Sequence, residues 1–244
     1  MRGAVMRNPM FVYDETLADL VLSYCRERLA LDPVPLDYGG YATPFSDLLE
    51  GLIGTSGTNP AKVLEVFTDR LATAVVSIDS PRFLSFIPAA PTKASLLFDM
   101  VVSCSSLNGT SWLLAAGVVA AENQALRLLS ELAGLPPSAG GTFVSGGSAA
   151  NLSALLVARD TAPHRMARWE GVSRPWIAVS SEAHSSVTKA LHILGIEAWQ
   201  VPTSNHRLTG EALATALEAA GDAAPVIGVV ATAGTTNAGI VDDL

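Results

Sequence analysis

The pattern of apolar positions changes about halfway along this 244-residue chain. In the first part apolar residues recur at helical spacing, which predicts helices over 16–31, 60–77 and 112–133. In the second part short apolar runs alternate with helical segments. These runs predict strands over residues 142–145, 176–180, 197–201 and 226–233. The segments between and beside them predict helices over residues 149–159, 185–194 and 210–220.

Alternating strands and helices are typical of an α/β fold with a parallel sheet flanked by helices. We expect an N-terminal helical and extended segment over residues 1–85, followed by an α/β domain over 86–244. The unbroken apolar run 226–233 further predicts a strand covered on both faces. Because ligands of such sheets bind beyond the carboxyl ends of the strands, the loops after Ser145, Ser180 and Ala233 should meet at one site.

Composition excludes several classes of function. The 15 Lys and Arg residues against 23 Asp and Glu give a net charge of −8, which argues against binding to nucleic acid or to an anionic membrane surface. The longest apolar run, 112–121, falls short of the roughly 20 residues that cross a bilayer. With no recognisable export signal and only two isolated cysteines, Cys25 and Cys104, we expect a cytoplasmic protein without disulfides.

The first candidate loop runs from Ser145 to Asn151 and reads Ser-Gly-Gly-Ser-Ala-Ala-Asn. Paired glycines allow a close backbone approach, and a helix start carrying the Ser148 hydroxyl suits a phosphate. The same composition also makes ordinary tight turns. The loop lacks the Gly-Lys-[Ser/Thr] end of a Walker A motif and the Gly-x-Gly-x-x-Gly spacing of a dinucleotide site.

The other two loops add polar side chains at strand ends. His184 stands between a strand and a helix, where an imidazole can cover a flat ligand or pass a proton, or simply cap the helix. Thr235, Thr236 and Asn237 follow the last apolar run, and we interpret Asp242 or Asp243 as a cap for a following helix. No two of the four histidines have a metal-binding helical spacing, so we predict no metal site.

Taken together, these loops resemble the group II pyridoxal-phosphate-dependent decarboxylases, which include the aromatic amino acid, histidine, glutamate and diaminobutyrate decarboxylases. Segments 143–156, 183–187 and 230–244 carry the resemblance, and segments 80–88 and 109–112 fit it as well. The similarity begins near residue 40. Three such motifs in the right order and spacing are strongly specific.

The resemblance implies a fold-type-I architecture, with a parallel or mixed sheet preceded by an N-terminal helical segment. It implies decarboxylation of an L-amino acid to its amine with pyridoxal 5′-phosphate, in a homodimer that residues 1–85 help to hold together. His184 would stack on the cofactor ring and transfer protons. The other cofactor-binding positions would be Gly147, Ser148, Ala149, Ala150 and Thr236, with Pro88 and Ala89 on the substrate side.

Two residues central to the family have no counterpart in these 244 residues. They are the aspartate that pairs with the pyridine nitrogen and the Schiff-base lysine; Asp242 and Asp243 belong to a turn and do not match the former. None of the three lysines, Lys62, Lys93 and Lys189, matches the lysine motif. We therefore expect the chain to correspond to the first part of such an enzyme, with the C-terminal part absent, and to be inactive by itself.

Three alternatives remain open from the residues alone. The same fold also serves aminotransferases and lyases. A serine hydrolase could use Ser148, which lies in a sequence close to Gly-x-Ser-x-Gly, with Asp160 or Glu182 and with His184 or His206. The chain could also be a non-catalytic remnant that only binds a partner.

Overall fold

The computed structural model describes residues 12–36, 50, 54–165, 174–221 and 224–243. The chain divides into two compact units, Met1–Ser106 and Leu107–Leu244. This division by contacts falls after α4 (Lys93–Cys104), whereas the functional division expected at residues 85 and 86 falls before it. The predicted boundary between residues 85 and 86 stays a prediction, because the two units found here are defined only by how compactly their residues pack.

Helices form the first unit. α1 (Glu15–Ala30) begins at Asp14, whose side chain accepts the N–H of Leu17 and so caps the helix. The single helix expected over residues 60–77 is instead three consecutive pieces with different hydrogen-bond periods. They are the α-helix α3 (Pro60–Val66), the π-turn η2 (Phe67–Leu71) and the 3₁₀-turn η3 (Ala72–Ala74).

A long-range ion pair ties α1 to the segment that follows η3. Nη2 of Arg28 donates to both carboxylate oxygens of Asp79, at 2.8 and 2.9 Å. These hydrogen bonds hold the pKa of Asp79 below its usual range, although partial burial of the carboxylate works in the opposite direction. The pair joins residues 51 positions apart in the sequence and therefore fixes the return of the chain to α1.

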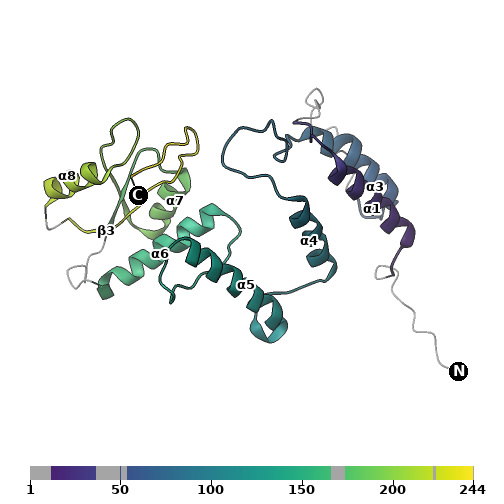
Figure 1. Ribbon diagram of the computed structural model, residues 1–244, viewed down its shortest axis with the longest axis horizontal. Helices are drawn as coiled ribbons and strands as arrows, with labels where there is room; N and C mark the ends of the chain where they lie inside the picture. Colours follow the sequence, from purple (N-terminus) through teal and green to yellow (C-terminus); the bar gives the residue numbers. More distant parts are fainter. Residues whose placement is uncertain (1–11, 37–49, 51–53, 166–173, 222–223, 244) are drawn as a thin grey trace. The chain divides into compact units, whose positions relative to one another are not determined.

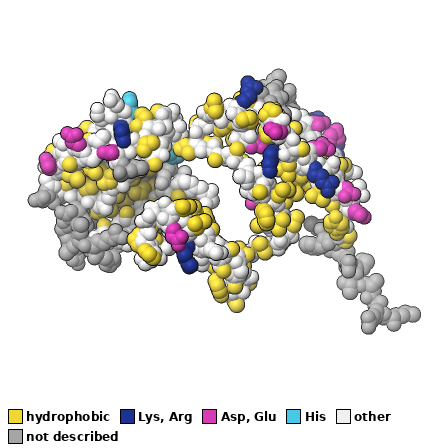
Figure 2. All heavy atoms as spheres, viewed as in Figure 1, with side chains coloured by type: hydrophobic (Ala, Val, Ile, Leu, Met, Phe, Trp, Pro, Cys, Tyr) yellow, Lys and Arg dark blue, Asp and Glu magenta, His cyan; other side chains and the backbone are white. Residues whose placement is uncertain are grey.

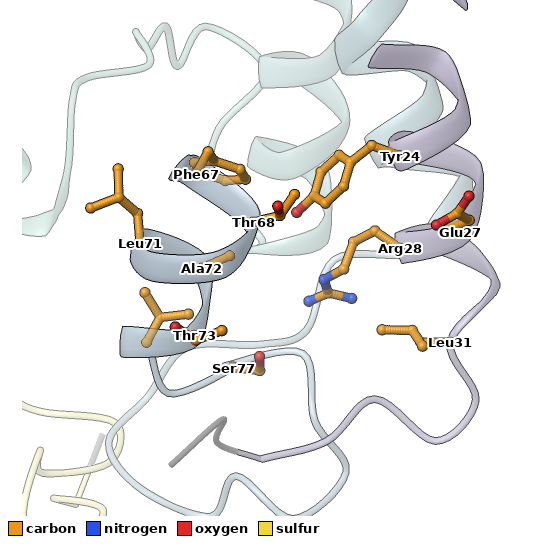
Figure 3. Close-up of a pocket in the computed structure, with 11 residues that line it drawn as sticks. Tyr24, Glu27, Arg28, Leu31, Phe67, Thr68, Leu71, Ala72, Thr73 and Ser77 are labelled. Carbon is orange, nitrogen blue, oxygen red and sulfur yellow. The ribbon is translucent and has the colours of Figure 1, made fainter. Parts of the chain in front are cut away.

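A pocket of about 500 Å³ lies beside this ion pair (Figure 3). Tyr24 from α1 and Phe67 from η2 meet there edge to face, with ring centroids 5.7 Å apart. Leu71 and Leu31 add apolar lining. None of the residues expected to bind the cofactor lines this pocket.

A three-stranded parallel sheet forms the centre of the second unit, where helices α6 (Gly147–Arg165), α7 (Ser185–Leu194) and α8 (Gly210–Ala220) gather around it (Figure 1). Its strands are β1 (Trp176–Val179), β2 (Glu197–Gln200) and β3 (Val226–Val229), in the order β2-β1-β3. α7 (Ser185–Leu194) connects β1 to β2, and α8 (Gly210–Ala220) connects β2 to β3. These findings confirm the expected α/β class with a parallel sheet.

The core has two sides, and alternate residues of β1 supply both. Ile177 and Val179 pack with Leu155 of α6 (Gly147–Arg165) and Leu191 of α7 on one face of the sheet. Ala178 packs on the other face. Its cluster contains Val201, Leu208 and side chains of α8. Successive side chains along a strand point to opposite faces of the sheet, so the central strand β1 contributes to both core clusters and is buried.

Two strand predictions were wrong. Residues 142–145 form no strand; they are exposed and unpaired, and α6 already begins at Gly147 rather than at residue 149. β3 ends at Val229 instead of residue 233, and it is half-buried, not covered on both faces. The reason is its place in the sheet, since β3 pairs with β1 on one side and has no neighbour on the other among the described strands.

Helix ends were more predictable than strands. α7 and α8 have the expected bounds because each starts at a capping side chain, His184 or Thr209, and ends at a glycine. Gly195 and Gly221 have φ values of 68° and 75°, which favour glycine. α5 (Trp112–Leu132) also agrees closely with its prediction, whereas α4, capped by Thr92, was missed.

Large apolar side chains remain on the surface of both units (Figure 2). No residue of α4 or α5 is buried, and Leu113 of α5 is 92% exposed. Despite this surface, none of the helices in the described part of the chain is long and apolar enough to cross a membrane. The described residues also contain no cluster of three or more His, Cys, Asp or Glu side chains that could hold a metal ion.

Candidate functional site

The carboxyl ends of β1 and β3 lie next to each other because the two strands are parallel neighbours. The N–H of Val230 donates to the carbonyl of Ala178 at 2.9 Å and extends the pairing to the end of the sheet. From β1 the chain passes to β2 on one side, and from β2 it crosses to β3 on the other side. A reversal of strand order of this kind opens a crevice at the carboxyl ends, where ligands of α/β proteins bind.

His184 lies in the loop that follows the carboxyl end of β1. Its Nδ1 accepts the N–H of Ser186 at 3.2 Å, so the imidazole caps α7. The Ser186 hydroxyl lies 2.8 Å from the same Nδ1. The residue is exposed even though its Nδ1 caps the helix.

The start of α6 reaches the same loop. Nδ2 of Asn151 donates to Oγ of Ser186 at 2.8 Å, across 35 positions of sequence. The helix after the candidate phosphate loop is therefore hydrogen-bonded to the first turn of α7, which directly follows His184. Since α6 begins at Gly147, the N–H groups of its first turn have no acceptor within the helix.

Gly146 and Gly147 leave room in front of this helix start. A Cβ built on either residue would meet nothing within 4 Å. Neither is among the described residues with positive φ, so the turn itself does not demand glycine. Ser148 is exposed in the first turn, and Ala149 and Ala150 follow it. The backbone here is open to a ligand.

The third loop contains two adjacent threonines, Thr235 and Thr236, which differ in burial. Thr235 is buried; its N–H donates to the carbonyl of Ile240 at 2.9 Å, and its Oγ1 accepts the N–H of Ile240 at 3.1 Å. Thr236 is half-buried and follows it directly. Gly234, with a φ of 111°, makes the turn from β3 into this loop.

Asp242 does not cap a helix among the described residues, which corrects the interpretation for Asp242 and leaves that for Asp243 a prediction. Its side chain is buried, and its two oxygens accept backbone N–H groups of Leu208 and Thr232, each at 2.8 Å. Asp243 is exposed and lies 3.8 Å from Arg207. Sequence reasoning missed the role of Asp242, because both of its partners are distant along the chain.

Ser180 was also missed as a candidate. It follows the buried strand β1 directly, and its side chain is almost fully buried. Within the described part of the chain its Oγ has no hydrogen-bond partner. Buried hydroxyls are nearly always satisfied in folded proteins, so this open hydroxyl at the carboxyl end of the central strand is an exception.

The remaining candidates divide between the two units. Pro88 and Ala89 belong to the first unit, in an exposed extended segment before α4. Lys189 is exposed on α7. No hydrogen bond of the described residues joins Ser148 to a histidine, since Nδ1 of His184 contacts Ser186 and Nδ1 of His206 contacts Glu182 at 3.1 Å. A serine-hydrolase triad is therefore not assembled in this structure.

Comparison with known proteins agrees with the geometry. Residues 53–244 match the model of the pyridoxal-dependent decarboxylase conserved domain. An aromatic-L-amino-acid decarboxylase of Bacillus atrophaeus is 32% identical over 208 residues, which are 82% of this chain and 42% of that protein. An L-2,4-diaminobutyrate decarboxylase of Rhizobium meliloti is 33% identical over 195 residues, which are 77% of this chain and 38% of that protein.

Solved structures show the same fold. A structure of Oryza sativa TDC with PLP and tryptamine superposes with a TM-score of 0.77 at 22% identity, covering 93% of this chain and 50% of the other. Mouse CSAD gives the same TM-score and identity, with 94% and 50% covered. The chain thus spans half or less of the length of these relatives. The match of the conserved domain over residues 53–244 places the chain in the pyridoxal-dependent decarboxylase family.

Proposed function

We propose that this chain binds pyridoxal 5′-phosphate at the carboxyl ends of β1 and β3, and that the reaction it serves is decarboxylation of an L-amino acid to the corresponding amine. The observation that carries the proposal is the hydrogen bond between Asn151 of α6 and Ser186 in the first turn of α7, in a chain of the pyridoxal-dependent decarboxylase family. Each of the residues concerned has a chemical feature that suits one part of this cofactor.

The start of α6 suits the phosphate group. Unpaired N–H groups and the positive end of the helix dipole stabilise an anion there. The open space at Gly147 admits a close approach of the phosphate, and the exposed hydroxyl of Ser148 can donate a further hydrogen bond. Ala149 and Ala150 have no side chain large enough to obstruct it, although the N–H of Ala150 already donates to the carbonyl of Gly146 at 3.1 Å.

The loops after β1 and β3 suit the ring. The exposed imidazole of His184 offers a flat partner for one face of an aromatic ligand. The unpartnered hydroxyl of Ser180 and the half-buried side chain of Thr236 supply polar groups at the same edge of the sheet. Polar side chains from adjacent strand ends can thus orient the ring beneath His184.

When bound, pyridoxal phosphate supplies an electron-accepting ring that stabilises the charge left on an amino acid as carbon dioxide departs. In our proposal His184 holds the ring and moves protons at its imidazole. The substrate-binding role of Pro88 and Ala89 stays a prediction from the family resemblance. Lys62, Lys93 and Lys189 take no part in covalent attachment of the cofactor. A chain with these three lysines alone binds the cofactor reversibly and does not turn over substrate.

We also propose that the chain assembles with a second copy of itself. Large apolar side chains on α4 and α5 support this, because Phe98 is 70% and Leu132 76% exposed. Exposed apolar area of this extent is usually covered by a partner.

Titration of the chain with pyridoxal phosphate, followed by absorbance and by quenching of tryptophan fluorescence, tests the proposal. We expect saturable binding that dialysis reverses, and no lysine adduct after borohydride reduction. Ser148→Ala should weaken binding roughly tenfold, because it removes a hydrogen bond to a charged group. His184→Ala should weaken it several-fold through loss of the stacking contact.

Matched controls come from the same helix and the same ligand. Ser153→Ala changes an exposed serine of α6 whose hydroxyl bonds the carbonyl of Ala149, and it should leave binding unchanged. Pyridoxal without phosphate should bind wild type and Ser148→Ala equally weakly. Equal affinity of wild type and Ser148→Ala for the phosphorylated form would refute the phosphate site. A borohydride-fixed adduct of one lysine in stoichiometric yield would refute the absence of a cofactor-binding lysine in this chain.

A further inference from the structure

Three side chains form a continuous hydrogen-bonded chain between α6 and the candidate ring-stacking histidine. Nδ2 of Asn151 lies 2.8 Å from Oγ of Ser186, and this Oγ lies 2.8 Å from Nδ1 of His184. The backbone N–H of Ser186 also points at Nδ1, at 3.2 Å. Ser186 is only 5% exposed, so water does not compete freely for these contacts.

The direction of the hydrogen bonds follows from the two nitrogen groups that can only donate. A peptide N–H can only donate, so Nδ1 of His184 must present its lone pair to Ser186. The amide nitrogen of Asn151 can likewise only donate, so Oγ of Ser186 accepts from it. The hydroxyl proton of Ser186 is then left to point at Nδ1, which makes every bond run from Asn151 toward His184.

We infer that Asn151 and Ser186 are positioning residues that hold the His184 ring in one orientation and in the tautomer with its proton on Nε2. The inference rests on the proposed function only in that His184 matters because it stacks on the cofactor. Neither Asn151 nor Ser186 contacts the reacting atoms in this proposal. Both act through the imidazole, by fixing which of its nitrogens carries the proton.

The hydrogen-bonded chain connects the proposed phosphate-binding helix α6 to the proposed ring-stacking residue His184. Asn151 lies one turn after the phosphate-facing start of α6, and Ser186 lies in the first turn of α7. A shift of α6 relative to α7 would lengthen the bond between Asn151 and Ser186 and loosen the histidine. The phosphate-binding helix and the ring-stacking residue therefore keep a fixed relation to each other.

Nitrogen NMR of the whole chain, labelled with ¹⁵N-histidine and free of cofactor, tests the inference. At about pH 8.5, where imidazole rings are ordinarily neutral, His184 should show a protonated Nε2 and an unprotonated Nδ1. His184→Asn identifies its signals among the four histidines. A wild-type spectrum with the proton of His184 on Nδ1 would overturn the inference without any further variant.

Two variants then test the roles of Asn151 and Ser186. Ser186→Ala should lower the ratio of the Nε2–H to the Nδ1–H tautomer by about tenfold, the equivalent of one hydrogen bond. Asn151→Asp should lower it at least as much, because a carboxylate attracts the Ser186 hydroxyl proton and turns the oxygen lone pair toward Nδ1. Ser186→Thr, which keeps the hydroxyl, should restore the wild-type ratio.

Ser185→Ala is the matched control, since Ser185 is the exposed neighbour of Ser186 in the same helical turn. It should leave the tautomer ratio unchanged. An unaltered ratio in folded Asn151→Asp would overturn the role of Asn151, and an unaltered ratio in folded Ser186→Ala that of Ser186. If Ser186→Ala does not fold, the tautomer ratios of Asn151→Asp and Ser186→Thr still test whether these residues hold His184 in the inferred tautomer. The inferred tautomer without cofactor binding would refute only the proposed function, whereas cofactor binding with the other tautomer would refute only the inference.

Discussion

Asp242 and Leu208 are joined by a hydrogen bond of 2.8 Å from the backbone N–H of Leu208 to the carboxylate of Asp242, 34 residues later in the chain. The second carboxylate oxygen accepts the N–H of Thr232 at the same distance. One buried side chain thus ties the loop containing Thr236 to the segment between β2 and α8. It fixes that loop where the proposed site needs it.

Replacing Asp242 should destabilise the second unit strongly. Asp242→Ala leaves one buried and one partly buried N–H group without an acceptor, which costs about 3 kcal/mol of unfolding free energy in total. Urea unfolding followed by circular dichroism measures this loss. Asp243→Ala is the control, because its carboxylate is exposed and should contribute less than about 0.5 kcal/mol. Equal effects of the two substitutions would contradict the role assigned to Asp242.

The Arg28–Asp79 ion pair should make the stability of the first unit depend on pH. Because the Arg28 hydrogen bonds lower the pKa of Asp79 in the folded state, the stabilisation is present above the unfolded pKa of about 4. It is lost as the pH falls through the lower folded pKa. At pH 7, Asp79→Ala should cost roughly 2 kcal/mol, the value of a hydrogen bond to a charged group.

Unfolding in urea at a series of pH values checks this prediction. The difference between wild type and Asp79→Ala should be constant above about pH 5 and should shrink below about pH 4. Glu65→Ala serves as a control in the same unit, since both partners of its pair with Lys62 are more than half exposed. A difference that grows as the pH falls would show that the sign is wrong.

Two glycines with equal space around them should respond in opposite ways to substitution by alanine. A Cβ on Gly195 or on Gly210 would meet nothing within 4 Å, but only Gly195 has a positive φ, at 68°. Gly195→Ala should therefore destabilise the protein by about 1 kcal/mol. Gly210→Ala, in the first turn of α8, should be neutral or slightly stabilising. Thermal unfolding distinguishes the two, and equal shifts in Tm would argue against the backbone explanation.

Local signals explain what the sequence could predict about the fold. The bounds of α7 and α8 follow from a capping side chain at one end and a glycine at the other, all within a dozen residues. Strand 142–145 was predicted wrongly because an apolar run shows only that a segment could pair, and pairing depends on distant residues. The edge position of β3 is non-local for the same reason.

The residues of the candidate site also divide into those that local motifs predict and those that depend on distant parts of the chain. His184 and Ser148 are recognisable from motifs, because each stands at a strand end or helix start that the sequence places. Asn151 and Ser186 acquire their roles only from a contact across 35 positions. Ser180 and Asp242 are distinguished by burial, which no local pattern reports.

The unpaired side of β3 makes the state of this chain depend on its own concentration. Among the described strands β3 has one neighbour, so its outer row of N–H and C=O groups can accept another strand. At high concentration that strand can come from a second molecule, and association stabilises whichever form it binds. Dilution should therefore lower the apparent Tm.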